Sequence, residues 1–359
     1  MSNKPGVYIA AIGMITAVGA STEATVAAVN AEISRLQSTD DYCTRDNMPC
    51  TVAYVPEEAL PDVTHRLNRE EDASLQMGTM LKTIEVAIKE VLQDYPEEAP
   101  ITLFFSGPEA YHNGPYTLSP KFPEFIVKQT DVNIDLASSR LLSLGRAGVI
   151  DAIDLAIRYL EQQPVSYVLV GGADSYLDDD IMDFLQADDR VLAEGVMDGF
   201  APGEGAGFLL LTNDINKAMK ENKGVISLSP PGVAMEEGHM YSKEPYRGDG
   251  LAQAFRKALD GRDPGKKIGR IYSTMNGEKY WAKEYGVATL RAKEFFAEAL
   301  VLEHPADCFG DTGGAAGALL VGLAAQTLLK QGKEDTCLVT CSSDQAYRAA
   351  ICVNYEKVT

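Results

Sequence analysis

A glycine-rich turn in the last sixth of the chain holds the residues best placed for chemistry. The stretch CFGDTGGAAGALLVGLA, residues 308–324, runs from a turn directly into an apolar helix. Such a turn presents free backbone N–H groups, which stabilise negative charge on a substrate. The side chain beside them is nevertheless the carboxylate of Asp311, which would repel an oxyanion. Asp311 is therefore either a general base or cation ligand, or a cap for the start of the helix.

Alternating strands and helices would position this turn. Apolar runs bounded by glycine predict buried strands, and apolar residues three or four positions apart predict helices. In 146–163, for example, Ile150, Ile153 and Ile157 share one helix face. The expected strands are 6–15, 101–107, 139–145, 166–173, 199–211, 224–235, 267–277, 335–343 and 349–356. The expected helices are 21–36, 74–95, 146–163, 250–261, 288–300 and 315–332.

The strand–helix order repeats along the chain, which indicates an internal duplication. We expect one half in residues 1–215 and the other in 225–359, with a polar connection between them. Buried strands rich in Val, Leu and Ile between helices predict an α/β architecture with helices on both faces of the sheets.

The composition of the 359 residues is that of an ordinary globular protein, with 45% hydrophobic and 23% charged residues. The formal net charge of −20 argues against nucleic acid and anionic membrane surfaces as partners. An acidic protein partner would need a local basic patch, and the sequence makes none evident. Uninterrupted apolar runs stay below the roughly 18 residues of a membrane span, and the first residues do not resemble a signal peptide. We therefore expect a cytoplasmic protein.

The six cysteines give no sign of a metal or redox site. They form no Cys-x-x-Cys pair and have no histidine at metal-ligand spacing. The glycines after the first strand also lack the spacing of a dinucleotide fingerprint. We expect neither a metal nor a cofactor.

Several motifs, in order, resemble the elongating β-ketoacyl-acyl-carrier-protein synthases. They are VYIAAIGMITAVG at 7–19, YVLVGGAD at 167–174, DGFAPGEGAG at 198–207, GHMYSKEPYRGDG at 238–250 and GDTGGAAGA at 310–318. The resemblance spans almost the whole chain. It implies a thiolase-like α/β fold, with duplicated βαβ halves in α/β/α/β/α layers.

The same resemblance implies that the synthase residues are missing. The family uses a nucleophilic cysteine at a buried helix start, two histidines that support decarboxylation, and a lysine. The cysteine position falls on Gly145, or on Arg146 with a one-residue shift. The histidine positions fall on Asn276 and Asp311, and the lysine position falls near Ala306. No catalytic residue of the synthase type is therefore expected.

Three further side chains have alternative interpretations. Arg146 could pair with Asp311 and fill the former site. Asn276 could donate to an oxyanion, or it could be structural. Cys308, expected to be the only cysteine near the site, could replace the lost nucleophile, but no matched histidine would activate it.

These residues support two hypotheses. The first is a catalytically inactive, dimeric binding, scaffold or adaptor protein, in which the strand at 139–145 pairs across a two-fold axis. It would be a homodimer, or the silent partner of an active ketoacyl synthase like the chain-length factors, in contact with a carrier protein. The alternative is an acyl-thioester hydrolase, decarboxylase or transferase that uses Asp311, Asn276 and Cys308. An open cavity between Gly145, Asn276 and Asp311 would favour the enzyme, and a site filled by Arg146 would favour the scaffold.

Overall fold

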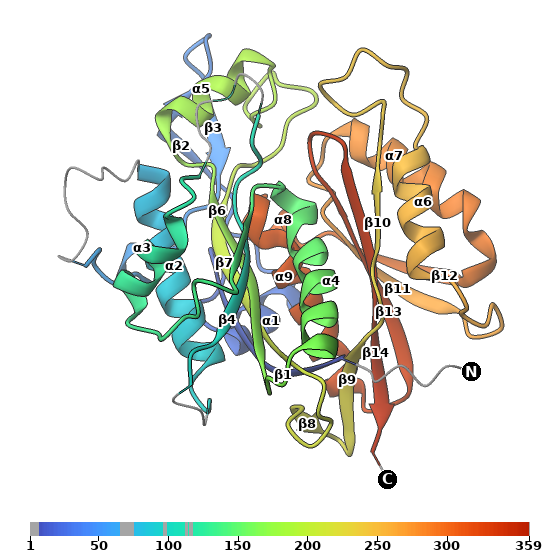
Figure 1. Cartoon of the computed structure of the whole chain (residues 1–359). Helices are drawn as coiled ribbons and strands as arrows, with labels where there is room; N and C mark the ends of the chain where they lie inside the picture. The colour runs from blue at the N-terminus through green and yellow to red at the C-terminus, as the bar shows by residue number, and fades with distance from the viewer. Residues whose placement is uncertain (1–6, 65–74, 96–98, 112–113, 115–117, 359) are drawn as a thin grey trace.

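Two five-stranded halves join into one mixed β-sheet (Figure 1). The computed structural model describes residues 7–64, 75–95, 99–111, 114 and 118–358. The strand order is β5-β4-β6-β7-β1 in the first half and β12-β11-β13-β14-β9 in the second. The first half contains β1 (Val7–Thr16), β4 (Thr102–Ser106), β5 (Arg140–Leu142), β6 (Val168–Ser175) and β7 (Glu204–Thr212). The second contains β9 (Gly224–Leu228), β11 (Ile268–Ser273), β12 (Phe296–Glu303), β13 (Asp335–Ser342) and β14 (Tyr347–Lys357).

The two halves have the same topology, which confirms the expected duplication. In each half the strand next to the edge is parallel to both of its neighbours. Strand β4 pairs in this way with β5 and β6, and β11 pairs with β12 and β13. The inner strands are antiparallel in both halves. A short pairing of Val7 with Leu228 and of Tyr8 with Ser227 joins the halves. The residue limits 1–215 and 225–359 remain a prediction.

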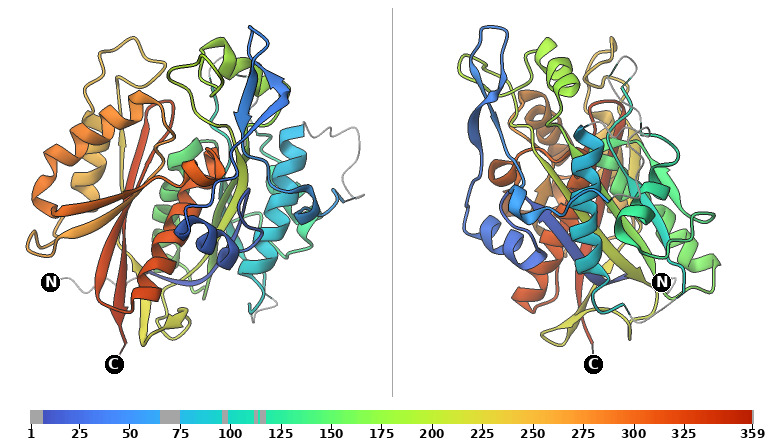
Figure 2. Two further views of the ribbon diagram at one scale, coloured as in Figure 1. Left: turned by 180° about the vertical axis from the view of Figure 1, so that it is seen from behind. Right: turned by 90° about the vertical axis from the view of Figure 1, so that its left-hand side faces the viewer.

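Helices cover both outer faces and fill the space between the half-sheets, giving the expected α/β/α/β/α layers (Figures 1 and 2). Helices α2 (Leu75–Val91) and α3 (Phe122–Thr130) pack on the outside of the first half. Helices α6 (Asp249–Ala258) and α7 (Lys279–Arg291) pack on the outside of the second. The central core lies between, around α4 (Gly148–Gln162) and α9 (Ala316–Gln331).

The two central helices differ in how they are buried. In α4 (Gly148–Gln162), the predicted apolar face is buried and Arg158 lies on the opposite, exposed side. In α9 (Ala316–Gln331), small and aliphatic residues are buried nearly all round. Among the described residues, Gly313–Gln331 is the one helical stretch long and apolar enough to cross a membrane, but 83% of its apolar window is buried. It is a core helix, as expected for a helix that is hydrophobic on every side.

Smaller elements complete the fold. Strands β2 (Gln37–Cys43) and β3 (Pro49–Val52) form a hairpin that packs with α5 (Asp179–Ala187). Helix α1 (Thr22–Asn30) begins at the side-chain cap Ser21, and α8 (Ala306–Phe309) is a single turn. Strands β8 (Lys220–Glu221) and β10 (Gly232–Met235) extend the sheet beside β9 and β14.

Several sequence predictions of element boundaries are wrong. The helix expected over 288–300 is the end of α7 followed by β12, because parallel pairing with β11 overrides the helix propensity of this Ala- and Glu-rich segment. The strand expected over 224–235 is interrupted at 230–231, where two prolines separate β9 from β10. The strand expected over 139–145 is only three residues long, since the chain turns into a 3-10 helix at Gly145.

Candidate functional site: a buried ion-pair cluster

The predicted site residues meet where the two central helices begin. Gly145 opens a 3-10 turn (η3, Gly145–Ala147) that continues into α4, and its φ of +59° is a left-handed conformation that favours glycine. Gly313 opens the corresponding turn (η5, Gly313–Ala315) before α9, with a φ of +47°. Asp311 lies two residues before Gly313, and its Oδ1 accepts a hydrogen bond from the Gly313 N–H at 3.0 Å. This bond closes a turn ahead of the helix. The N-cap residues of η5 and α9 are Thr312 and Ala315, neither with a side-chain cap, so the prediction that Asp311 caps the helix is not borne out.

Arg146 points inward from the first turn and contacts two carboxylates. Its Nε donates to Asp311 Oδ2 at 2.7 Å and Oδ1 at 3.0 Å, and its Nη1 donates to Asp344 Oδ1 at 2.6 Å. Its Nη2 lies 2.5 Å from Asp311 Oδ2, at an angle that makes an ionic contact without a hydrogen bond. Arg146 is only 1% exposed. The structure thus confirms the Arg146–Asp311 ion pair that the sequence offered as one interpretation.

A second arginine closes the network from the loop after α5. Arg190 Nη1 donates to Asp344 Oδ2 at 2.6 Å, while its Nε and Nη2 donate to the Glu278 carboxylate at 2.7 and 2.8 Å. We call Arg146, Arg190, Glu278, Asp311 and Asp344 the ion-pair cluster. None of the five is more than 5% exposed. Buried charges are tolerated when they are paired in this way.

The electrostatics keep Asp344 and Arg146 charged. Burial alone would raise the pKa of the Asp344 carboxyl, but Arg190 and Arg146 hold it well below its usual range. Burial would lower the pKa of Arg146, but Asp311, Tyr176 and Asp344 raise it well above its ordinary value. A permanently charged guanidinium between carboxylates has no proton to give or take near neutral pH.

Aromatic rings and a neutralised carboxyl surround the cluster. The Arg146 guanidinium lies 5.4 Å from the Trp281 ring centroid and 5.9 Å from that of Phe200. Glu109 accepts backbone hydrogen bonds from Asp344 and Gln345 at 2.8 and 2.9 Å. Burial and the nearby Asp344 carboxylate raise the pKa of Glu109 to about 8.

Asn276 is brought into the site, but its amide is already used. Its Nδ2 donates to Asp311 Oδ2 at 2.8 Å and to Glu278 Oε2 at 3.1 Å. Its Oδ1 accepts from the Glu278 N–H at 3.2 Å. Both donor and acceptor sides of the amide thus hold the cluster together, and this geometry favours the structural interpretation over an oxyanion donor.

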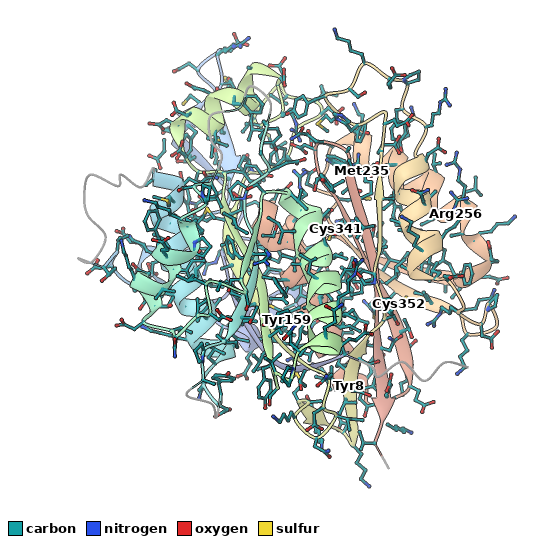
Figure 3. The ribbon with its side chains drawn as sticks, viewed as in Figure 1. Tyr8, Tyr159, Met235, Arg256, Cys341 and Cys352 are labelled. Atoms are coloured by element: carbon teal, nitrogen blue, oxygen red, sulfur yellow. The ribbon has the colours of Figure 1, made fainter. Side chains whose placement is uncertain are left out.

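The cysteines near the site are poor nucleophiles. Burial, followed by the carboxylates of Asp307 and Glu32, raises the pKa of the Cys308 thiol. The expectation that Cys308 is the only nearby cysteine is wrong, because Cys341 lies at the end of β13 near the start of α4 (Figure 3). Burial raises the pKa of Cys341 despite the nearby Arg146 charge. A thiol with a raised pKa is mostly protonated and unreactive.

Two small cavities reach the described residues at and beside the cluster. The cavity that reaches Asp311 has a volume of about 20 Å³ and is lined also by Thr274, Phe309 and Leu320. A second cavity of about 20 Å³ lies beside Glu109. Each is about the size of one water molecule. Two larger hollows lie elsewhere. One of about 500 Å³ is lined by residues within 44–48 and 186–198, and one of about 320 Å³ is lined by residues within 235–256.

Sequence reasoning missed Arg190, Glu278 and Asp344. Arg190 follows α5 in a polar loop and Asp344 lies in the turn between β13 and β14. Such loop positions have no periodicity that would mark them as buried.

The fold matches solved ketosynthases over nearly the whole chain. The ishigamide ketosynthase/chain length factor superposes with a TM-score of 0.76 at 15% identity, covering 99% of this chain and 100% of that one. The ketosynthase from module 6 of the bacillaene synthase from Bacillus subtilis 168 gives 0.76 at 14% identity, covering 98% and 72%. The ketosynthase ApeO with its chain length factor ApeC from Xenorhabdus doucetiae gives 0.70 at 18% identity, covering 99% and 100%.

These similarities define the class of fold. The chain has the mixed α/β, thiolase-like fold of the ketosynthases and chain length factors. No protein-family model and no curated protein matches the sequence. At identities of 12–18% the structural matches establish the fold alone, so function must be argued from the residues of the site.

Proposed function

We propose that this protein is a catalytically silent ketosynthase-like subunit that works by binding, as a dimeric scaffold or as the partner of an active synthase. One observation carries the proposal. Arg146 stands at the buried helix start, at or next to the position where the resemblance implies a nucleophile, and pairs with Asp311 and Asp344. An arginine has no nucleophilic form at neutral pH, and its side chain occupies the space that an acyl group would need.

The rest of the cluster supports the same conclusion. Asp311 and Asn276 stand at the two implied histidine positions, and the Asp311 carboxylate accepts hydrogen bonds from both Arg146 and Asn276. Replacement of a reactive centre by a satisfied ion-pair network preserves the fold while removing the chemistry. The alternative, a rebuilt thioester enzyme, has no comparable support, because the Cys308 thiol has a raised pKa.

A dimer is the state we expect for binding. Strand β5 ends the first half-sheet, so its outer edge has no strand partner among the described residues. The half-exposed Leu136 lies just before it, with 42% of its surface accessible. Pairing of β5 with a second ketosynthase-like subunit would continue the sheet. Solved relatives include a ketosynthase in complex with its chain length factor and a ketosynthase with an acyl-carrier protein. An active synthase and a carrier protein are therefore the first partners to test.

The experiment is incubation of the purified protein with acetyl- and longer acyl-thioesters of carrier protein and coenzyme A, with and without malonyl thioester. Intact-protein mass reports covalent acylation, and released thiol reports turnover. We expect no adduct and no release above the buffer blank. A stable adduct, or thiol release that Asp311→Ala or Cys308→Ala abolishes, would establish the enzyme hypothesis instead.

A further inference from the structure

The outer helices of the second half carry positive charge in an otherwise acidic chain. Residues 243–293 contain twelve Lys and Arg against six Asp and Glu, an excess of six positive charges. Since the whole chain has a net charge of −20, the remainder carries −26. The charges are therefore strongly segregated, although the sequence analysis found no basic patch.

The fold increases this segregation at the surface. Two of the six acidic residues, Glu278 and Glu284, are buried and paired with Arg190 and Arg348. Ten of the twelve basic residues are exposed. They lie on α6, on α7 and on the adjoining loops, and α6 and α7 contact each other. We call this surface, residues 243–293 of the outer layer, the basic face.

Most of the basic face is free to bind. Arg256 and Lys283 form no ion pair in the part of the chain that the structure describes, although Lys283 lies 5.1 Å from the Tyr246 ring centroid. Arg291 pairs with Asp249 at 2.7 Å, but both side chains are about half exposed. Figure 3 shows Arg256 on the side of the molecule away from α2 and α3. Exposed basic side chains of this kind attract an acidic partner at long range.

The shape of the basic face favours a protein partner. A hollow of about 320 Å³ is lined by Arg247 and Arg256, but also by four acidic residues, Glu236, Glu237, Glu244 and Asp249. Two exposed apolar residues lie at the basic face, Met235 on the hollow and Leu290 on α7, with 52% and 69% of their surfaces accessible. This mixture fits a folded surface with its own charges and apolar contacts. A long nucleic acid or a flat anionic membrane would also come close to the acidic remainder, and like charges repel within the Debye length of about 8 Å.

We propose that the basic face of α6 and α7 is a docking surface for a compact, acidic protein. A second copy of this chain is a poorer occupant, because its acidic surface would dock head to tail and leave an open-ended chain. The proposal does not depend on the ion-pair cluster. It stands even if the cluster proves reactive.

The test uses a fluorescently labelled acyl carrier protein as a small, folded, acidic probe, with anisotropy as the readout. The variant Arg256→Glu/Lys283→Glu reverses two charges on the basic face. The matched control Lys121→Glu/Lys330→Glu reverses two exposed lysines elsewhere, with the same change in net charge. Circular dichroism verifies the fold of each variant.

We expect the basic-face variant to lose at least about tenfold in affinity and the control to lose less than about threefold, with binding weakened by added salt. Equal losses in both variants would overturn the proposal, as would no measurable binding of the carrier protein. Tighter binding of a DNA duplex or of phosphatidylserine vesicles than of the carrier protein would overturn it in favour of those partners. Thioester turnover and subunit mass, measured on the same variants, separate this outcome from failure of the silent-subunit proposal.

Discussion

The two central helices begin in the same way and differ in what occupies the start. Both follow a left-handed glycine, Gly145 or Gly313, and a three-residue 3-10 turn. The next residue is Arg146 in the first half and Gly314 in the second. Arg146 fills its site with a guanidinium, whereas the Gly314 N–H donates to Asp174 Oδ2 at 2.8 Å. The duplicated backbone thus supports a side-chain ion pair at one helix start and a hydrogen bond from a backbone N–H to a carboxyl group at the other.

Packing explains why the two positions are not interchangeable. A Cβ atom at Gly314 would lie 2.6 Å from the Gly107 carbonyl oxygen. At the first helix start, the Arg146 side chain instead finds two carboxylates from the other half, Asp311 and Asp344. Each half therefore completes the buried helix start of the other, and four predictions test this comparison.

The largest effect is expected from removing the guanidinium. Arg146→Ala leaves the buried Asp311 carboxylate without its cation and Asp344 with Arg190 alone. Removing one partner of a buried ion pair typically costs about 3–5 kcal/mol in the free energy of unfolding. Chemical denaturation of wild type and variant measures the loss. An exposed control, Lys121→Ala, is expected to change stability by less than about 0.5 kcal/mol. A loss of that small size for Arg146→Ala would show that the guanidinium is not part of the packed core.

The opposite helix start is tested by adding a methyl group. Gly314→Ala pushes Cβ against backbone atoms of Gly107, so we expect a loss of about 1–3 kcal/mol. Gly78 in α2 is the matched control, because a Cβ there meets nothing within 4 Å. Gly78→Ala is expected to stabilise by about 0.5–1 kcal/mol, from the higher helix propensity of alanine. Equal effects of the two substitutions would contradict the packing argument.

The two ends of the sheet extend the comparison to assembly. We expect Leu136→Asp, beside β5, to weaken the dimer at least about tenfold, which corresponds to 1.4 kcal/mol. Leu290→Asp, on α7 near the opposite edge, is the control and should leave the dimer unchanged. Mass photometry over a dilution series gives both dissociation constants. Dissociation by the Leu290 substitution alone would place the dimer contact at the wrong end of the sheet.

The smallest effect concerns Asp174, whose carboxyl group accepts a hydrogen bond from the Gly314 N–H. Burial raises the pKa of Asp174 to about 7, despite hydrogen bonds from Gly314, Ser175 and Gln76. The folded state therefore binds more protons than the unfolded state between pH 4 and 7, and stability from this group falls as pH rises through that window. Asp174→Asn should flatten this fall, measured by denaturation at several pH values. An unchanged pH dependence would mean that Asp174 is ionised throughout.

Much of this architecture was predictable from local patterns. The apolar face of α4 and the glycine turn before α9 follow from residue spacing, and both lie where the sequence placed them. The ion pair between Arg146 and Asp311 was one expected outcome, because the resemblance brought their turns together. At these positions the residue spacing along the chain and the contacts made in the folded structure lead to the same interpretation.

The rest of the site depends on contacts that no local pattern encodes. Arg190 meets Asp344 across 154 positions of sequence, from a polar loop to a hairpin turn. Polar loops are ordinarily expected at the surface, so neither residue stood out. Strand β12 was likewise missed, since its pairing with β11 is set by the whole sheet rather than by its own composition.

A double-mutant cycle tests most directly the claim that Arg146 and Asp311 form one buried, coupled unit. The free energy of unfolding is measured for wild type, Arg146→Met, Asp311→Asn and the double variant. We predict a coupling energy of about 1.5 kcal/mol or more, because each single change leaves a partner unpaired inside the protein. Additive losses, with a coupling below about 0.5 kcal/mol, would contradict the account and reopen the helix start as a site for chemistry.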